Sequence, residues 1–201
     1  MQQLANLDTL VVKQKKEWGE ILTGFETRNN YVVMSPDGRE MYYAGEDSGF
    51  LSRMFLKSMR PFTIDVVGTD GIPVIQIRRP FRFFFPEVSV FDTQGQILGT
   101  IKKRFSLARR IYSVLDSNGQ EIFELFGPML HPWTFEIRER GMEIGKITKK
   151  WSGLAKEMFT DADNFGVTFP ENWDIRTKAL FLGAVFLIDF VHFEKSNNNN
   201  D

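Results

Sequence analysis

The side chains best suited to bind a ligand gather in a basic and aromatic stretch between residues 78 and 110. Eight cations face two carboxylates there, a local charge of +6, and three consecutive phenylalanines follow Arg82. Such cations attract anionic headgroups, and the rings can enter the apolar part of a bilayer. The alternative is a strand with rings on both faces and a solvated basic face. The lipid-binding candidates are Arg78, Arg79, Arg82, Phe83, Phe84, Phe85, Lys102, Lys103 and Arg104.

A second candidate site is a pair of carboxylates, Asp161 and Asp163, with a glycine following at position 166. Calcium takes about six to eight oxygen ligands, several of them anionic. The spacing is similar to that of an EF-hand loop, but Phe165 stands where a side-chain ligand belongs and no glutamate closes the loop. The alternative is that residues 160–169 form a strand and a turn that the aspartates shape.

The chain has few of the residues that covalent catalysis needs. There are two histidines, His131 and His192, and no cysteine, so the usual nucleophile and base pairs are missing. No phosphate-binding glycine loop or dinucleotide fingerprint is present. We therefore expect no catalytic residues and no enzyme. A net charge of −1 and the absence of a binding motif also disfavour a nucleic-acid binder.

The bulk composition suits one globular domain of 201 residues, with 20 phenylalanines for its core. Without cysteine the chain forms no disulfide and carries no palmitoyl anchor. Residues 1–10 do not read as a secretory signal, and no lipidation motif is found at either end. We expect an N-terminal segment over residues 1–19, one domain over residues 20–194 and a disordered polar tail over residues 195–201.

Hairpin turns recur between residues 20 and 150. Five short segments end in a glycine and four of them contain aspartate, and asparagine or aspartate near glycine is typical of tight β-turns. The flanking segments 62–66, 88–90 and 135–138 alternate apolar and polar residues, which predicts strands with one buried face. This pattern favours an all-β sandwich or barrel. The glycines are Gly38, Gly71, Gly95, Gly119 and Gly141.

The segment 179–193 is apolar on every side except at Asp189 and His192. A helix of this kind is either a membrane span or wholly surrounded by protein. Fifteen residues reach roughly 22 Å, short of a hydrocarbon core of about 30 Å. We therefore predict a buried helix threading a closed barrel, with Asp189 hydrogen-bonded and Asn172 or Asp174 capping its start.

Several motifs are similar to those of phospholipid scramblases, in order and spacing. The most specific is FTDADNFGVTFP at residues 159–170, preceded by ITKKWSG at 147–153 and followed by the apolar segment 180–194. Weaker likenesses are LTGFET at 22–27, AGED at 44–47 and RPFT at 60–63. The resemblance covers residues 20–194.

The resemblance implies a mainly β, tubby-like fold, which is a closed barrel of about twelve strands around one hydrophobic C-terminal helix. It implies calcium-stimulated, ATP-independent movement of phospholipids between leaflets. It also implies a calcium set of Asp161, Asp163, Phe165, Val167 and Asn172, where Asn172 replaces the usual aspartate and removes a charge. Some members are described as lipid-binding signalling proteins.

We thus expect a scramblase-like protein acting at the cytosolic face of a membrane, with the plasma membrane as the first choice. Its partners would be phospholipids, anionic ones above all, and a homo-oligomer is an open alternative. The competing hypothesis is a lipid-binding or phosphoinositide-binding regulatory module that transports nothing.

Overall fold

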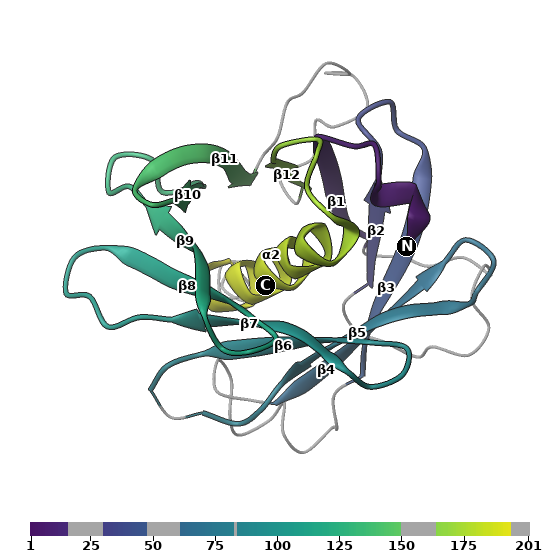
Figure 1. Cartoon of the computed structure of the whole chain (residues 1–201), viewed down its shortest axis with the longest axis horizontal. Helices are drawn as coiled ribbons and strands as arrows, with labels where there is room; N and C mark the ends of the chain where they lie inside the picture. The colour runs from purple at the N-terminus through teal and green to yellow at the C-terminus, as the bar shows by residue number, and fades with distance from the viewer. Residues whose placement is uncertain (16–29, 48–60, 83, 150–163, 194–201) are drawn as a thin grey trace, which may run out of the picture.

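The computed structural model describes residues 1–15, 30–47, 61–82, 84–149 and 164–193. Within these ranges the chain forms twelve strands, a short 3₁₀ helix and one long α-helix (Figure 1). The elements are η1 Gln2–Leu4, β1 Thr9–Lys15, β2 Asn30–Met34, β3 Glu40–Asp47, β4 Phe62–Gly68, β5 Pro73–Arg79, β6 Glu87–Asp92, β7 Ile97–Lys103, β8 Arg110–Asp116, β9 Glu121–Gly127, β10 Thr134–Glu139, β11 Met142–Lys149, β12 Asn164–Thr168 and α2 Ile175–His192.

The strands close into one antiparallel barrel in which each strand pairs with its sequence neighbours and β12 pairs with β1. Closure leaves no open sheet edge among these strands. The predicted closed barrel around a C-terminal helix is confirmed. Its first strand, β1, comes from the segment 1–19 that the sequence assigned outside the domain, so the barrel begins earlier than residue 20.

The turn chemistry explains the tight hairpins. All five predicted turn glycines adopt positive φ, between 76° and 87°. At Asp92 and Asp116 the carboxylate accepts two backbone N–H groups of the following turn, which is how aspartate stabilises such bends. The pairing of β10 with β11 shifts between Ile137 and Arg138, which places a β-bulge opposite them next to Gly145.

The core lies between the inward faces of the strands and α2. The predicted alternation holds over residues 62–66 of β4, 88–90 of β6 and 135–138 of β10. Glycine at position 99 lets β7 approach the helix, since a Cβ there would lie 3.0 Å from Leu180.

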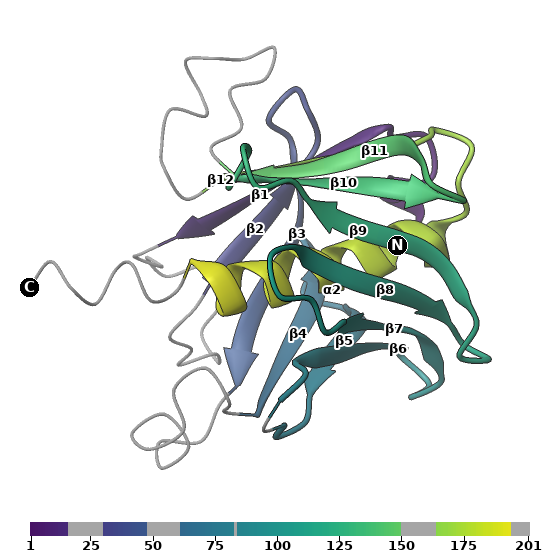
Figure 2. The same ribbon diagram turned by 90° about the vertical axis from the view of Figure 1, so that its left-hand side faces the viewer.

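Helix α2 runs through the barrel (Figures 1 and 2) and is buried without a break from Lys178 to Phe190. Asp174 caps it, accepting the backbone N–H of Thr177 at 3.0 Å, which confirms one of the two predicted caps. In the part of the chain that the structure describes, no helix has the length and apolar run needed to cross a membrane.

The antiparallel order gives the barrel two different ends. At the turn end lie the five glycine turns, η1 and the start of α2. At the loop end lie the end of α2 and three longer loops, residues 80–86, 104–109 and 128–133. The candidate lipid-binding residues that the structure describes belong to the loop end.

Candidate functional site

A surface pocket of about 330 Å³ lies at the loop end beside β6 and β7. Phenylalanine rings form its apolar wall: Phe84 is 85% exposed and Phe85 is 40% exposed. Arg82 and Lys102 bring positive charge, although Arg82 also donates to Glu87 at 2.6 Å. Rings next to exposed cations suit an amphipathic anion. The complete lining is Phe81, Arg82, Phe84, Phe85, Glu87 and Lys102; the candidate Phe83 lies outside the described residues.

The two neighbouring arginines of β5 point to opposite faces of the barrel. Arg78 is exposed, with its guanidinium carbon 4.6 Å from the centre of the Phe91 ring. Arg79 is 2% exposed and lies 4.3 Å from the ring centre of Phe190, in the last turns of α2. A cation there complements the negative end of the helix dipole. Arg79 therefore supports the helix from inside the barrel, away from any headgroup.

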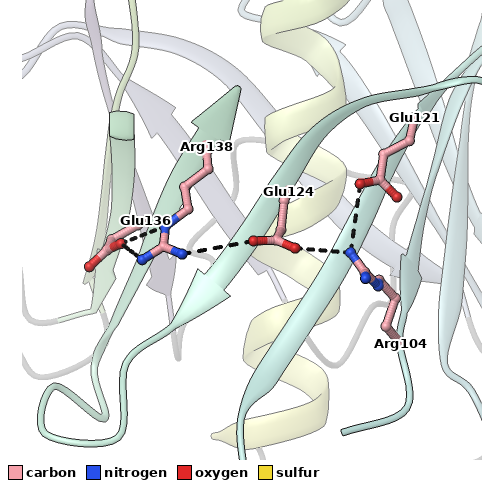
Figure 3. A network of polar contacts seen from close by, with 5 residues as sticks. All are labelled: Arg104, Glu121, Glu124, Glu136 and Arg138. Carbon is pink, nitrogen blue, oxygen red and sulfur yellow. Dashed lines mark hydrogen bonds and ion pairs between the residues drawn. The ribbon is translucent and has the colours of Figure 1, made fainter. Parts of the chain in front are cut away.

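Arg104 belongs to a chain of ion pairs on the outer surface (Figure 3). Its guanidinium lies 2.9 Å from Glu124 and 3.7 Å from Glu121. Glu124 also approaches Arg138, which pairs with Glu136 at 2.6 Å. Two carboxylates next to Arg104 offset its charge, so it contributes less to an anion site than Arg82 or Lys102.

Lys103 faces the barrel interior near the end of α2, in register with Tyr112 of β8. Burial lowers the pKa of Lys103. The Tyr112 hydroxyl and the Nε2 atom of His192 are 2.7 Å apart. Burial first, and then the nearby charges of Lys103 and Arg110, lower the pKa of His192 to about 4. The imidazole is therefore neutral at pH 7, and it shares a hydrogen bond with the Tyr112 hydroxyl.

Asp189 is the second polar residue that interrupts the apolar helix. Its carboxylate lies 3.2 Å from Nζ of Lys149 and accepts the Tyr31 hydroxyl at 2.9 Å. The two charged side chains are only 8% and 6% exposed. The predicted hydrogen bonding of Asp189 is thus confirmed, and the group acts as a lock between α2, β11 and β2 at the loop end.

Lys178 forms a second lock at the turn end, which the sequence did not predict. The side chain is fully buried, and Nζ lies 2.7–3.0 Å from the carbonyl oxygens of Leu4, Ala5, Leu7 and Glu171, which share its three N–H donors. A buried ammonium is tolerated only with such partners. The signal available beforehand was a lysine directly preceding the apolar run.

The calcium candidates do not come together in the described part of the chain. Phe165 and Val167 lie in β12, which pairs with β1 and β11 on its two sides, so their carbonyls belong to the barrel ladder. Asn172 lies beyond β12, at the turn end. These three residues fit calcium poorly as one ligand set. Asp161 and Asp163 lie outside the described residues.

The exposed apolar side chains of two other loops were not predicted. Leu107 is 94% exposed and Leu130 is 90% exposed, with Phe105 and Met129 beside them. The signal was present in the sequence: both loops place apolar residues in turn-forming segments, RFSLAR at 104–109 and PMLHPW at 128–133.

Comparison with known proteins agrees with this architecture. A protein from Arabidopsis thaliana of known crystal structure aligns with 93% of this chain and 94% of its own, with a TM-score of 0.53 and 13% identity. That likeness concerns the fold, a tubby-like barrel around a helix.

The sequence comparisons are more specific. Mouse phospholipid scramblase 1 is 35% identical over 98% of this chain, and human phospholipid scramblase 1 is 31% identical over the same share. Human phospholipid scramblase family member 5 is 30% identical, and this chain covers 78% of it. The chain spans 65% of the mouse protein and 67% of the human scramblase 1. The model of the Scramblase family matches residues 1–195, so the chain belongs to the phospholipid scramblase family.

Proposed function

We propose that the protein moves phospholipids between the two leaflets of a membrane without ATP. The observation that supports this beyond family membership is the pocket at the loop end, where exposed rings and cations adjoin. Lys102 and Arg82 would contact the headgroup phosphate, and Phe84 and Phe85 would contact the first acyl carbons. The exposed pair between Arg82 and Glu87 is weak enough to open, since such pairs contribute about 0–1 kcal/mol.

A non-transporting lipid-binding module is the second candidate. The two locks on α2 favour it: Lys178 holds the start of the helix and the Lys149–Asp189 pair holds its end. A helix fixed in this way leaves the lipid no path through the barrel. If the protein does transport lipid, it would act at the membrane surface or as an oligomer.

The test is a dithionite assay on vesicles that contain a fluorescent phospholipid and the reconstituted full chain. We expect the bleached fraction to rise from about half, the outer-leaflet share, towards completeness. Vesicles that bind the protein but keep about half of the dye protected would favour the second candidate. Arg82→Gln with Lys102→Gln should slow flipping, whereas Lys146→Gln with Arg176→Gln, a control pair of exposed cations in β11 and at the start of α2, should not.

Any calcium dependence would rest on Asp161 and Asp163, because the other three candidates fit the ion poorly. Two carboxylates with few further ligands imply weak affinity. Isothermal titration of the wild type and of Asp161→Ala tests this. Calcium heat that the substitution abolishes would support the assignment, and heat unchanged by it would exclude this pair.

The proposed partners are anionic phospholipids of the cytosolic leaflet, with the plasma membrane as the first location to examine. The supporting feature is the positive charge at the loop end, since that leaflet attracts basic surfaces. Binding to vesicles with and without phosphatidylserine measures this preference.

A further inference from the structure

The exposed apolar side chains of the described residues concentrate at one end of the barrel. Eleven large hydrophobic side chains are exposed, and eight of them belong to the three loops of the loop end. The other three, Ile72, Ile97 and Met142, are spread over separate turns at the opposite end. Scattered exposed residues are ordinary, but a concentration of them marks an interaction surface. The eight are Phe81, Phe84, Phe85, Phe105, Leu107, Met129, Leu130 and Trp133.

The three loops are neighbours on the barrel rim. They join β5 to β6, β7 to β8 and β9 to β10, so two strands separate each loop from the next. Strands lie about 4.8 Å apart, which places successive loops roughly 10 Å from one another. Each loop presents a largely exposed apolar residue: Phe84 at 85%, Leu107 at 94% and Leu130 at 90%. The three loops therefore place exposed apolar side chains at the same barrel end as the end of α2.

The loop over residues 128–133 is held in a defined shape. The Arg110 guanidinium donates to the carbonyls of Pro128 and His131, both at 3.1 Å, and to that of Pro132. The His131 N–H donates to the Pro128 carbonyl. Backbone groups satisfied within the protein lower the cost of moving a loop towards hydrocarbon.

Trp133 fixes the same loop to the helix, and Ser106 shapes the loop beside it. The Trp133 ring stacks on Phe193 with centres 5.4 Å apart, and Trp133 is 41% exposed. Tryptophan in this half-exposed state is typical of the membrane interface. In the neighbouring loop, Ser106 Oγ accepts the Arg109 N–H at 3.1 Å, which leaves the Leu107 side chain at the tip.

The charge of the three loops suits an anionic surface. Residues 80–86, 104–109 and 128–133 contain three arginines, Arg82, Arg104 and Arg109, and no aspartate or glutamate. Arg104 is offset by carboxylates of β9, and Arg82 pairs with Glu87 of β6 at 2.6 Å, an exposed pair weak enough to open. Separate apolar tips with cations between them match a deformable bilayer better than the continuous core of a protein interface.

We propose that the loop end docks onto an anionic bilayer, with Phe84, Leu107 and Leu130 inserted below the headgroups and the barrel standing on this end. The proposal deepens the membrane partner of the proposed function, but it does not depend on lipid transport. It adds two loops to the single pocket described above and orients the whole barrel.

The first experiment measures vesicle affinity of the full chain with and without about 30% phosphatidylserine. Leu107→Ser with Leu130→Ser should weaken binding about tenfold or more. The control, Ile72→Ser with Met142→Ser, removes similar apolar surface from the turn end, where these residues are 62% and 67% exposed. It should leave affinity within about twofold. All four side chains are exposed, so both variants should melt like the wild type. Equal affinity of the two double variants would overturn the proposal.

The second experiment uses the absence of cysteine from the chain. A Leu130→Cys variant and a Met142→Cys variant each carry one environment-sensitive fluorophore. On anionic vesicles the label at 130 should shift to the blue and be quenched by lipids bearing acyl-chain quenchers, while the label at 142 should not respond. Binding without a response at 130 would show that another face contacts the bilayer.

The same samples separate this inference from the proposed function. A responding label without dithionite bleaching of the inner leaflet supports docking and refutes transport. Bleaching with a silent label supports transport and refutes docking by this end. Sedimentation at rising protein concentration tests whether a second copy of the chain covers this surface. Bilayer docking would be overturned if the wild type forms an oligomer, the double variant Leu107→Ser with Leu130→Ser is monomeric, and both bind vesicles with equal affinity.

Discussion

The ion pair between Lys149 and Asp189 should control the stability of the barrel. The two charges lie 3.2 Å apart, and the side chains are 8% and 6% exposed. At an effective dielectric constant of about 20, their attraction is about 5 kcal/mol before the cost of desolvation. Removing one partner leaves a buried charge, which costs about 3–5 kcal/mol. Asp189→Leu and Lys149→Met should each lower the free energy of unfolding by that amount.

The double variant should recover most of the loss. Asp189→Leu with Lys149→Met leaves no unpaired charge from the pair, and apolar replacements of buried pairs are often neutral. The Tyr31 hydroxyl loses the carboxylate as acceptor, a smaller penalty of about 1–3 kcal/mol. We therefore expect a coupling energy of about 2 kcal/mol or more between the two positions.

Urea unfolding followed by circular dichroism measures these changes. With a slope of about 2–3 kcal/mol per M, each single variant should lower the midpoint by about 1–2 M. Lys15→Met is a matched control, because Lys15 and Glu40 lie 3.0 Å apart with side chains 35% and 38% exposed. Its loss should stay below about 1 kcal/mol. The reasoning is refuted if the single variants at 149 and 189 also lose less than about 1 kcal/mol of unfolding free energy. It is equally refuted if the loss in the double variant equals the sum of the two single losses.

Three further predictions concern other contacts of α2. The pKa of His192 is about 4 in the folded protein against 6.5 ordinarily, so the unfolded chain binds more protons between these values and stability falls as pH drops through them. Urea unfolding at pH 7 and at pH 4 measures this fall in unfolding free energy. The substitution His192→Gln should make the fall smaller by up to about 3 kcal/mol. Lys178→Met leaves four carbonyls without their donor and should cost about 3 kcal/mol or more, while exposed Arg176→Met should cost under about 0.5 kcal/mol in the same assay. Gly99→Ala would place a Cβ 2.3 Å from the Leu115 carbonyl oxygen and should lower the melting temperature by several degrees; an unchanged melting temperature would contradict the close packing of β7.

The barrel could be predicted because its determinants are local. Turn chemistry near each glycine, period-two alternation and the length of the apolar segment each report on a few consecutive residues. Because these three signals agree, only a few architectures are compatible with all of them. The family resemblance supplied the number of strands. The strand over Thr9–Lys15 was missed because its sequence, TLVVKQK, alternates poorly and its partners lie at residues 30–34 and 164–168.

The side-chain roles were harder to predict because they depend on distant partners. A run of cations in sequence does not show which face each occupies: Arg78 and Arg79 are adjacent, yet one is exposed and the other is buried against Phe190. Arg104 is offset by Glu124, twenty residues away. Lys178 contacts the carbonyls of Leu4, Ala5 and Leu7, more than 170 positions earlier. Pairings at such separations are properties of the closed barrel, not of the local sequence.

The positions of the two locks also bear on how lipid transport could occur. If α2 left the barrel to enter the bilayer, it would carry Asp189 and Lys178 with it, since both belong to the helix. Each charge costs up to about 2.5–3.5 kcal/mol within a span, the most at its centre, so together they add at most about 5–7 kcal/mol to the loss of the core packing. The lock nearest the proposed docking surface does not weaken near hydrocarbon, because a lower dielectric strengthens an ion pair against its separated charges. Docking by the loop end therefore leaves the helix enclosed, and transport by this protein would proceed through loops that disturb the headgroup region from outside.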